Sequence, residues 1–387
     1  MTSARSSVPP FHAMEMAGLA TAREATGASV IHLEVGQPWS PAPAAVLAAA
    51  TRALERDRIG YTNASGLLSL RKRIAGHYQD WYGVELDPTA LVITAGASAG
   101  FTLAFLACFD PGDRVGVVEP GYPCYRNTLL ALGVEPVAIA VGPESRWVPT
   151  PELLDRAGPL DGLVVASPSN PTGTVLARER LAEVVEWCRA HDTQLISDEI
   201  YHGITYGQRA ESALALSSDA IVVSSFSKYF SMTGWRLGWI TAPPAVMEAV
   251  ERFQQNLYIC APALSQHAAV AAFDCAEELD GHVARYAHNR QVLLEGLASA
   301  GLTDRAAADG AFYVYADVSH LTDDSRLLCR RWLEEVGVTT GPGIDFDLAR
   351  GHQFVRFSYS GPVVTPISSS QRRHSRRESS VRWETSA

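Results

Sequence analysis

The sequence has little cysteine, almost no lysine and no long apolar run. Its six cysteines form no Cys-x-x-Cys pair, so neither a disulfide framework nor a zinc site is indicated, and a reducing compartment is expected. No stretch approaches the roughly 18 to 20 apolar residues of a membrane span, and the N-terminus lacks the pattern of a signal peptide. We therefore expect a cytoplasmic protein without a membrane partner.

Positive charge is also scarce, with 32 basic against 42 acidic residues and a net charge of -10. That balance argues against a nucleic-acid partner. The 387 residues are 47% hydrophobic and 19% charged, which is enough apolar material for a large core and a smaller second domain.

The middle of the chain contains seven short β-branched runs bounded by turn residues. They are Leu91–Thr94, Val115–Val118, Pro136–Val141, Leu163–Ala166, Gln194–Ser197, Ile221–Ser224 and Leu237–Thr241. Several gaps between them are typical of amphipathic helices, for example Arg178–His191, with Leu181, Val184, Val185 and Cys188 on one face. The pattern predicts an α/β fold with a mostly parallel seven-stranded sheet flanked by helices, and functional residues at the strand ends.

The rest of the chain indicates a second domain. After Pro243 the pattern becomes helical, with a long run from about 263 to 300, and strand-like pieces return at Ala311–Val318 and Gln353–Ser358. We predict a large domain over residues 46–290 and a smaller α+β domain built from both chain ends, residues 1–45 and 291–361.

Lysine occurs at two positions, Lys72 and Lys228. Lys228 directly follows a predicted buried strand. A lysine that only extends its charged end to the surface is not expected at such a position. A Schiff base needs an amine whose pKa is lowered by burial and by cationic neighbours. Ser225 and Arg236, on either side of Lys228, carry a hydroxyl and a forked guanidinium that suit a phosphate.

Two hydrolase-like motifs are set aside. Gly96-Ala97-Ser98-Ala99-Gly100 matches the nucleophile elbow of α/β-hydrolases, but no oxyanion loop precedes it and His352 would be an unsupported base. Small residues at that point simply let a helix start close to a strand end. The Ser-x-x-Lys match at Lys228 lacks the partner motifs of serine acylases.

Two further motifs precede the Lys228 segment in the chain. They are Ser167-Pro168-Ser169-Asn170-Pro171-Thr172-Gly173 and Asp198-Glu199-Ile200-Tyr201. Together these segments resemble the class I/II aminotransferase family of fold type I pyridoxal-phosphate (PLP) enzymes, over about residues 8–361. The resemblance implies PLP as cofactor and ping-pong transfer of an amino group from an L-amino acid to a 2-oxo acid. A C–S lyase on the same fold and a PLP-binding regulator remain alternatives, with a Ser98 hydrolase more remote.

The resemblance implies three catalytic residues. Lys228 would hold PLP as a Schiff base and move the substrate proton. Asp198 would pair with the pyridine nitrogen and keep it protonated, although a helix cap is its ordinary structural role. Tyr201, together with Asn170, would hydrogen-bond the cofactor's phenolate oxygen, although Asn170 also stands in a sequence that makes a good turn.

Further cofactor contacts follow from the same resemblance. The backbone of Ala97 and Ser98 at a helix start would bind the 5′-phosphate together with Ser225 and Arg236. Tyr122 would stack on the pyridine face. Tyr61 would reach the phosphate of the neighbouring subunit, which implies a homodimer with shared sites.

Substrate contacts are expected from both ends of the chain. Gly36 resembles the glycine whose backbone contacts the substrate, and Arg356 resembles the arginine that binds the substrate carboxylate. Asn170 is expected to contact the substrate as well. Ser98 stands where related aspartate aminotransferases often carry a lysine for acidic substrates. Dicarboxylate preference is therefore not indicated, and Phe11 and Trp39 would suit a neutral side chain.

Residues 362–387 depart abruptly from the family pattern. They contain five arginines and seven serines but few apolar residues, so they cannot bury enough surface to offset the entropy of ordering. We expect a disordered tail. Either it binds an acidic partner, or a shifted reading frame replaced a final helix; the abrupt change in charge and periodicity favours the second.

Overall fold

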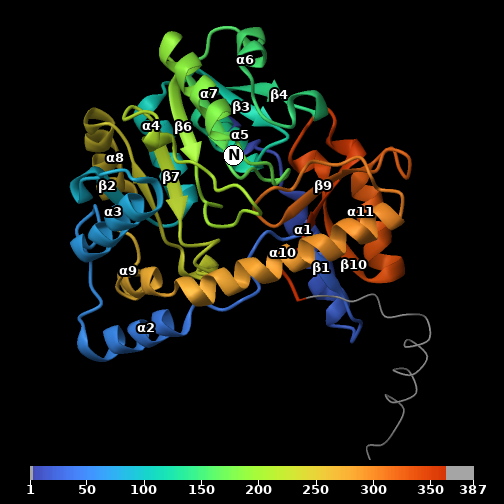
Figure 1. Ribbon diagram of the computed structural model, residues 1–387, viewed down its shortest axis with the longest axis horizontal. Helices are drawn as coiled ribbons and strands as arrows, with labels where there is room; N and C mark the ends of the chain where they lie inside the picture. Colours follow the sequence, from blue (N-terminus) through green and yellow to red (C-terminus); the bar gives the residue numbers. More distant parts are fainter. Residues whose placement is uncertain (1–2, 363–387) are drawn as a thin grey trace, which may run out of the picture.

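A seven-stranded sheet lies at the centre of the computed structural model, which describes residues 3–362 (Figure 1). Its strands are β2 Leu91–Thr94, β3 Arg114–Glu119, β4 Glu135–Ala140, β5 Gly162–Ala166, β6 Gln194–Asp198, β7 Ile221–Ser225 and β8 Gly238–Thr241. All seven predicted strands are confirmed. Their order is β2-β8-β7-β6-β5-β3-β4, and β8 is antiparallel to both of its neighbours while the remaining pairs are parallel.

Helices flank this sheet, as the pattern predicted. They are α3 Leu68–Tyr82, α4 Ala97–Cys108, α5 Pro123–Leu132, α6 Pro151–Ala157, α7 Arg178–Ala190 and α8 Pro244–Leu257. In α7, Leu181, Val184 and Cys188 are buried as expected, whereas Val185 is only half-buried and Trp187 is buried instead. The apolar face is therefore rotated slightly from the predicted one.

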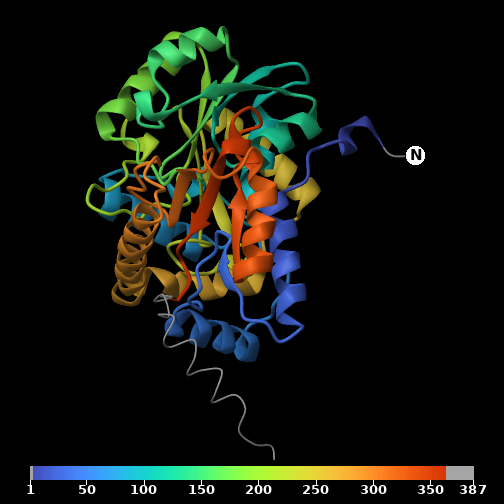
Figure 2. The same ribbon diagram turned by 90° about the vertical axis from the view of Figure 1, so that its right-hand side faces the viewer.

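A second sheet of four strands is built from both ends of the chain. Its strands are β1 Ile31–Leu33, β9 Tyr313–Asp317, β10 Val338–Pro342 and β11 Phe354–Ser358, in the order β1-β10-β11-β9. The sequence predicted β9 and β11, but the Gly and Pro that end β10 concealed that strand. Figure 2 shows the N-terminal α1 (His12–Glu24) alongside α11 (Ser325–Val336).

The predicted helical run from 263 to 300 is broken. It consists of α9 (Ala263–Ala269), a 3-10 turn over Val270–Asp274 and α10 (Ala276–Ser299), while α2 (Ala44–Arg56) packs on α9. The long helix α10 extends from α9 to the side of α11 (Figure 1). Its Asn289 side chain donates to the carbonyl of Tyr359 at 2.8 Å, which ties the helix to the chain beyond β11.

The predicted tail lies outside the described residues, apart from Pro362. Within residues 3–362, no helix has both the length and the apolar character that crossing a membrane requires.

Three neighbouring parallel strands position the functional side chains. Asp198 ends β6, Ser225 ends β7, and the chain leaving β5 leads directly to Asn170. Because the carboxyl ends of parallel strands lie at one edge of a sheet, these residues must gather there. Leu163 and Val222 of this sheet belong to the same buried core as Tyr313 of the smaller sheet. The two sheets therefore pack together through one continuous apolar core.

Candidate active site

One cavity of about 320 Å³ brings together all but one of the predicted site residues. Those that line it are Gly36, Ala97, Ser98, Tyr122, Asn170, Asp198, Tyr201, Ser225, Lys228, Arg236 and Arg356. Tyr61 is the exception: it lies between α2 and α3 and is 82% exposed. Phe11 lines the cavity as expected for a side-chain contact, but Trp39 does not and is largely exposed.

Lys228 extends into this cavity from the segment after β7. Its Nζ donates a hydrogen bond to the carbonyl of Gly36 at 2.6 Å. Burial lowers the pKa of Lys228 to about 8, and the positive charges of Arg356 and Arg236 act in the same direction, while Asp198 opposes them. A measurable fraction of this amine is therefore neutral, and nucleophilic, at neutral pH.

Asp198 is buried beside it, with both carboxylate oxygens held. Oδ1 accepts from the backbone N–H of Ile200 at 2.9 Å, and Oδ2 accepts from the hydroxyl of Tyr125. Burial raises the pKa of Asp198 to about 6, against the opposing effects of these hydrogen bonds and of Lys228. The group is mostly ionised above that pH. A turn, not a helix, follows Asp198, so helix capping does not account for it.

A cradle for an anion forms where α4 begins. Gly96 precedes the helix with φ +82°, and a Cβ there would collide with the Arg236 guanidinium, so the chain and the arginine approach each other closely. The free amides of Ala97 and Ser98 start the helix. The lining of this cavity includes no histidine that could serve Ser98 as a base, which leaves the hydrolase interpretation unsupported.

Arg356 enters from β11 of the small sheet and is 2% exposed. It donates to Oδ1 of Asn170 at 3.0 Å and to the carbonyl of Glu34. Its guanidinium lies 4.6 Å from the ring centre of Tyr313 and 4.7 Å from that of Phe346. Within residues 3–362 no carboxylate comes within 4.0 Å of it, although buried cations are normally paired.

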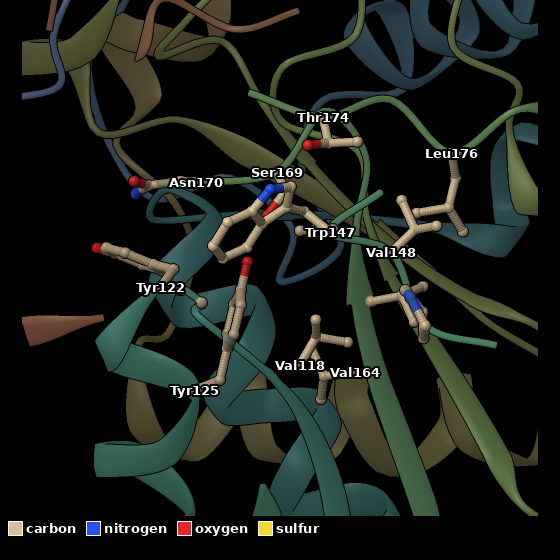
Figure 3. A pocket seen from close by; sticks show the side chains of 14 residues that line it. Val118, Tyr122, Tyr125, Trp147, Val148, Val164, Ser169, Asn170, Thr174 and Leu176 are labelled. Carbon is tan, nitrogen blue, oxygen red and sulfur yellow. The ribbon is translucent and has the colours of Figure 1, made fainter. Parts of the chain in front are cut away.

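Tyr122 stands at the start of α5 and forms another wall. In Figure 3 the polar ends of Tyr122 and Asn170 point to the same side, away from the apolar Val118 and Val164. The small cavity drawn there measures about 10 Å³, room for about one water molecule, so it cannot hold a substrate. The larger cavity, which shares Tyr122 and Asn170, is therefore the candidate active site.

Among the residues of this site that sequence reasoning missed are two tyrosines. Tyr125 holds Asp198, and its position three residues after Tyr122, one turn along α5, is a signal that could have found it. Tyr313 lines the cavity from β9, and its hydroxyl lies 2.5 Å from that of Tyr201. No local pattern marks Tyr313, since a buried strand tyrosine is ordinarily part of the core.

The family model for aminotransferase class I and II matches residues 28–365. The chain belongs to this family. It is an aminotransferase, as the motifs predicted, and the lyase alternative is not favoured. The valine–pyruvate aminotransferase of Mycobacterium tuberculosis is 51% identical over 92% of this chain and 94% of that protein. The aspartate/prephenate aminotransferase of Thermus thermophilus is 33% identical over 86% and 87%.

Solved structures agree in fold. An aminotransferase from Mycobacterium tuberculosis matches with a TM-score of 0.91 and 50% identity, covering 94% of this chain and 95% of that one. The Thermus thermophilus aspartate aminotransferase with maleate matches with a TM-score of 0.88 and 31% identity, over 94% and 96%. The large, mostly parallel sheet with flanking helices is therefore the aspartate aminotransferase fold.

Proposed function

We propose that this aminotransferase carries PLP on Lys228 and moves the amino group of a neutral, apolar L-amino acid to a 2-oxo acid such as pyruvate. One observation carries the proposal. Lys228, Arg236 and Arg356 converge on one cavity, and among residues 3–362 none of them has a carboxylate within 4.0 Å. Cations that share a cavity, and whose nearest carboxylates lie beyond ion-pair distance, suit a ligand that brings a phosphate and a carboxylate.

The surrounding groups fit PLP. The close approach of Gly96 and Arg236 at the start of α4 suits the 5′-phosphate. Ionised Asp198 suits a protonated pyridine nitrogen. Asn170 and Tyr201 would hydrogen-bond the phenolate oxygen of the ring, and Tyr122 would cover the ring face. When bound, PLP withdraws electrons from the substrate and so acidifies its Cα–H bond.

The chain's own groups would then move one proton and hold one carboxylate. Nζ of Lys228, with its lowered pKa, can accept the proton from the substrate Cα and return it to the cofactor side. Arg356 would bind the substrate carboxylate with the N–H donors that Asn170 and the carbonyl of Glu34 leave unused, because the planar fork matches two carboxylate oxygens. The carbonyl of Gly36 holds Nζ in place until it reacts.

The charges that line the cavity support a neutral substrate side chain. Its cations are Lys228, Arg236 and Arg356, and each already has a role in this proposal. A second substrate carboxylate would find no further cation in the lining. Phe11, just before α1, and Met14 in its first turn instead supply apolar surface. The name of the Mycobacterium tuberculosis relative points to the same class, with valine as donor and pyruvate as acceptor.

A half-reaction panel tests the proposal. Holoenzyme is mixed with one amino acid and no acceptor, and conversion of the cofactor to its aminated form is followed by absorbance. L-Valine and L-alanine should convert it at least about tenfold faster than L-aspartate. Equal rates with L-aspartate would refute the substrate class. Catalytic release of ammonia without an acceptor would instead indicate a lyase.

The subunit arrangement is part of the proposal. Tyr61 is 82% exposed, and other large apolar side chains are exposed in nearby segments: Leu54, Ile59, Leu257 and Ile259. Such a surface suits a second copy of this chain, whose cofactor phosphate Tyr61 would reach. Sedimentation should give a dimer. Hybrids of Tyr61→Phe and Lys228→Ala subunits should regain one intact site, whereas either variant alone should not.

The compartment is proposed from the cysteines. All six are free, and three of them are buried, which suits a reducing cytoplasm. Non-reducing mass measurement of protein purified without reductant should show six free thiols.

A further inference from the structure

Tyr313 lines the active-site cavity without a role in the proposed function. It belongs to β9 of the four-stranded sheet and is 1% exposed. Its hydroxyl contacts a residue in the turn that follows β6 of the large sheet, and its ring contacts a residue of the small sheet. Tyr313 therefore stands at the junction between the two halves of the site.

The first contact joins two hydroxyl groups. Oη of Tyr313 lies 2.5 Å from Oη of Tyr201, which follows β6. Each hydroxyl has a single proton. If Tyr201 directs its proton to the cofactor's phenolate oxygen, Tyr313 must be the donor in the pair. A hydroxyl that accepts one hydrogen bond becomes a stronger donor in the next.

The second contact concerns the arginine. Arg356 on β11 pairs with Tyr315 on β9, so Tyr313, two residues from Tyr315, projects on the same face of the small sheet. The Arg356 guanidinium lies over the Tyr313 ring at 4.6 Å, with the Phe346 ring at 4.7 Å as a second neighbour. The ring thus limits the directions that the guanidinium can take.

The third contact is with the chain near Lys228. A Cβ at Gly36 would collide with the Tyr313 hydroxyl, so residue 36 must be glycine for the tyrosine to reach Tyr201. The carbonyl of the same glycine accepts the hydrogen bond from Nζ of Lys228. Tyr313 therefore packs against the segment that holds the lysine.

We propose that Tyr313 is a positioning residue with two separable parts, and this rests on the proposed function. Its hydroxyl keeps the Tyr201 proton directed at the cofactor. Its ring keeps Arg356 oriented toward the substrate carboxylate. Neither part touches the reacting atoms, so each acts through the residue that it contacts.

The hydroxyl is tested by Tyr313→Phe in the holoenzyme. Without the donor to Tyr201, more negative charge stays on the cofactor oxygen and holds the proton on the nitrogen that joins the cofactor to Lys228. The pH midpoint of the visible absorption change should therefore rise by about one unit, the size of one hydrogen bond. Tyr315→Phe is the matched control, because Tyr315 is buried on the same strand and its hydroxyl has no partner among the described residues. Its midpoint should not move.

The ring is tested by Tyr313→Leu, compared with Tyr313→Phe. Loss of the ring should lower kcat/KM for L-valine about tenfold more than for isobutylamine, which has no carboxylate. Tyr313→Phe should lower both alike. If the leucine variant does not fold, Tyr313→Met, whose longer and unbranched side chain can adapt to the space that the ring leaves, replaces it.

The outcomes separate the two proposals. An unchanged midpoint in Tyr313→Phe, or an equal shift in Tyr315→Phe, would overturn the hydroxyl part. Equal losses with amine and amino acid would overturn the ring part. A wild-type protein with no visible cofactor band would instead overturn the proposed function itself, and this inference with it.

Discussion

Replacing Arg356 by methionine should abolish most of the activity with amino acids while leaving the fold intact. The guanidinium donates to Asn170 and to the carbonyl of Glu34, and no carboxylate of residues 3–362 lies within 4.0 Å of it. A ligand carboxylate would therefore be its first acidic partner. Methionine keeps much of the apolar volume between Tyr313 and Phe346 but removes the charge and all five donors.

The size of the effect follows from the bonds that would be lost. A carboxylate bound by a guanidinium fork forms two charge-assisted hydrogen bonds, each worth about 1.5–3 kcal/mol. A total of about 4 kcal/mol corresponds to a loss in kcat/KM on the order of a thousandfold. Isobutylamine, which lacks the carboxylate, should lose less than about tenfold. Arg356→Lys, which keeps the charge without the fork, should fall between wild type and Arg356→Met.

Stability separates a ligand-binding arginine from a structural one. Breaking a buried ion pair costs about 3–5 kcal/mol, because the partner charge is left uncompensated. Arg356 leaves no such partner, and removing it also removes the cost of burying its charge, although two carbonyl-type acceptors lose a donor. The free energy of unfolding should therefore change by no more than about 1–2 kcal/mol. A loss of several kcal/mol in denaturant unfolding, with amine and amino acid activities equally reduced, would refute the reasoning.

Four other predictions follow from the same geometry. Borohydride reduction of the holoenzyme should fix the cofactor on Lys228, so Lys72→Arg should still be labelled and Lys228→Ala should not; a label on Lys228→Ala would contradict the assignment. The rate at which cofactor-free protein captures PLP should rise with pH through a midpoint near pH 8, because only the neutral amine attacks; a midpoint near that of an ordinary lysine would be inconsistent with the lowered pKa. Asp198→Asn should retain cofactor but lose at least about a hundredfold in Cα-proton exchange, measured by deuterium uptake; near-normal exchange would contradict the proposed catalytic role of Asp198. Deleting residues 363–387, which are rich in serine and arginine and poor in apolar residues, should change activity and Tm little, and a clear loss of either would show that they contribute.

The sequence by itself determined the large sheet and the order of the residues along its edge. β-Branched runs of four to six residues are a local signal, and parallel strands place their carboxyl ends together, so Asn170, Asp198 and Ser225 could be predicted as neighbours without a structure. The spacing of these residues relative to Lys228 was also enough to reach the family, since it is read directly along the chain.

Tertiary structure alone decided which distant residues complete the site. Lys228 and the carbonyl of Gly36 are 192 residues apart, and the Tyr201 and Tyr313 hydroxyls are 112 apart. These contacts depend on how the small sheet registers and packs against the large one. That packing arises from many weak apolar contacts over both faces, and no local sequence pattern at the contacting residues indicates it. For the same reason Trp39, only three residues after Gly36 of the site, lies outside the cavity, whereas Tyr313 lies within it.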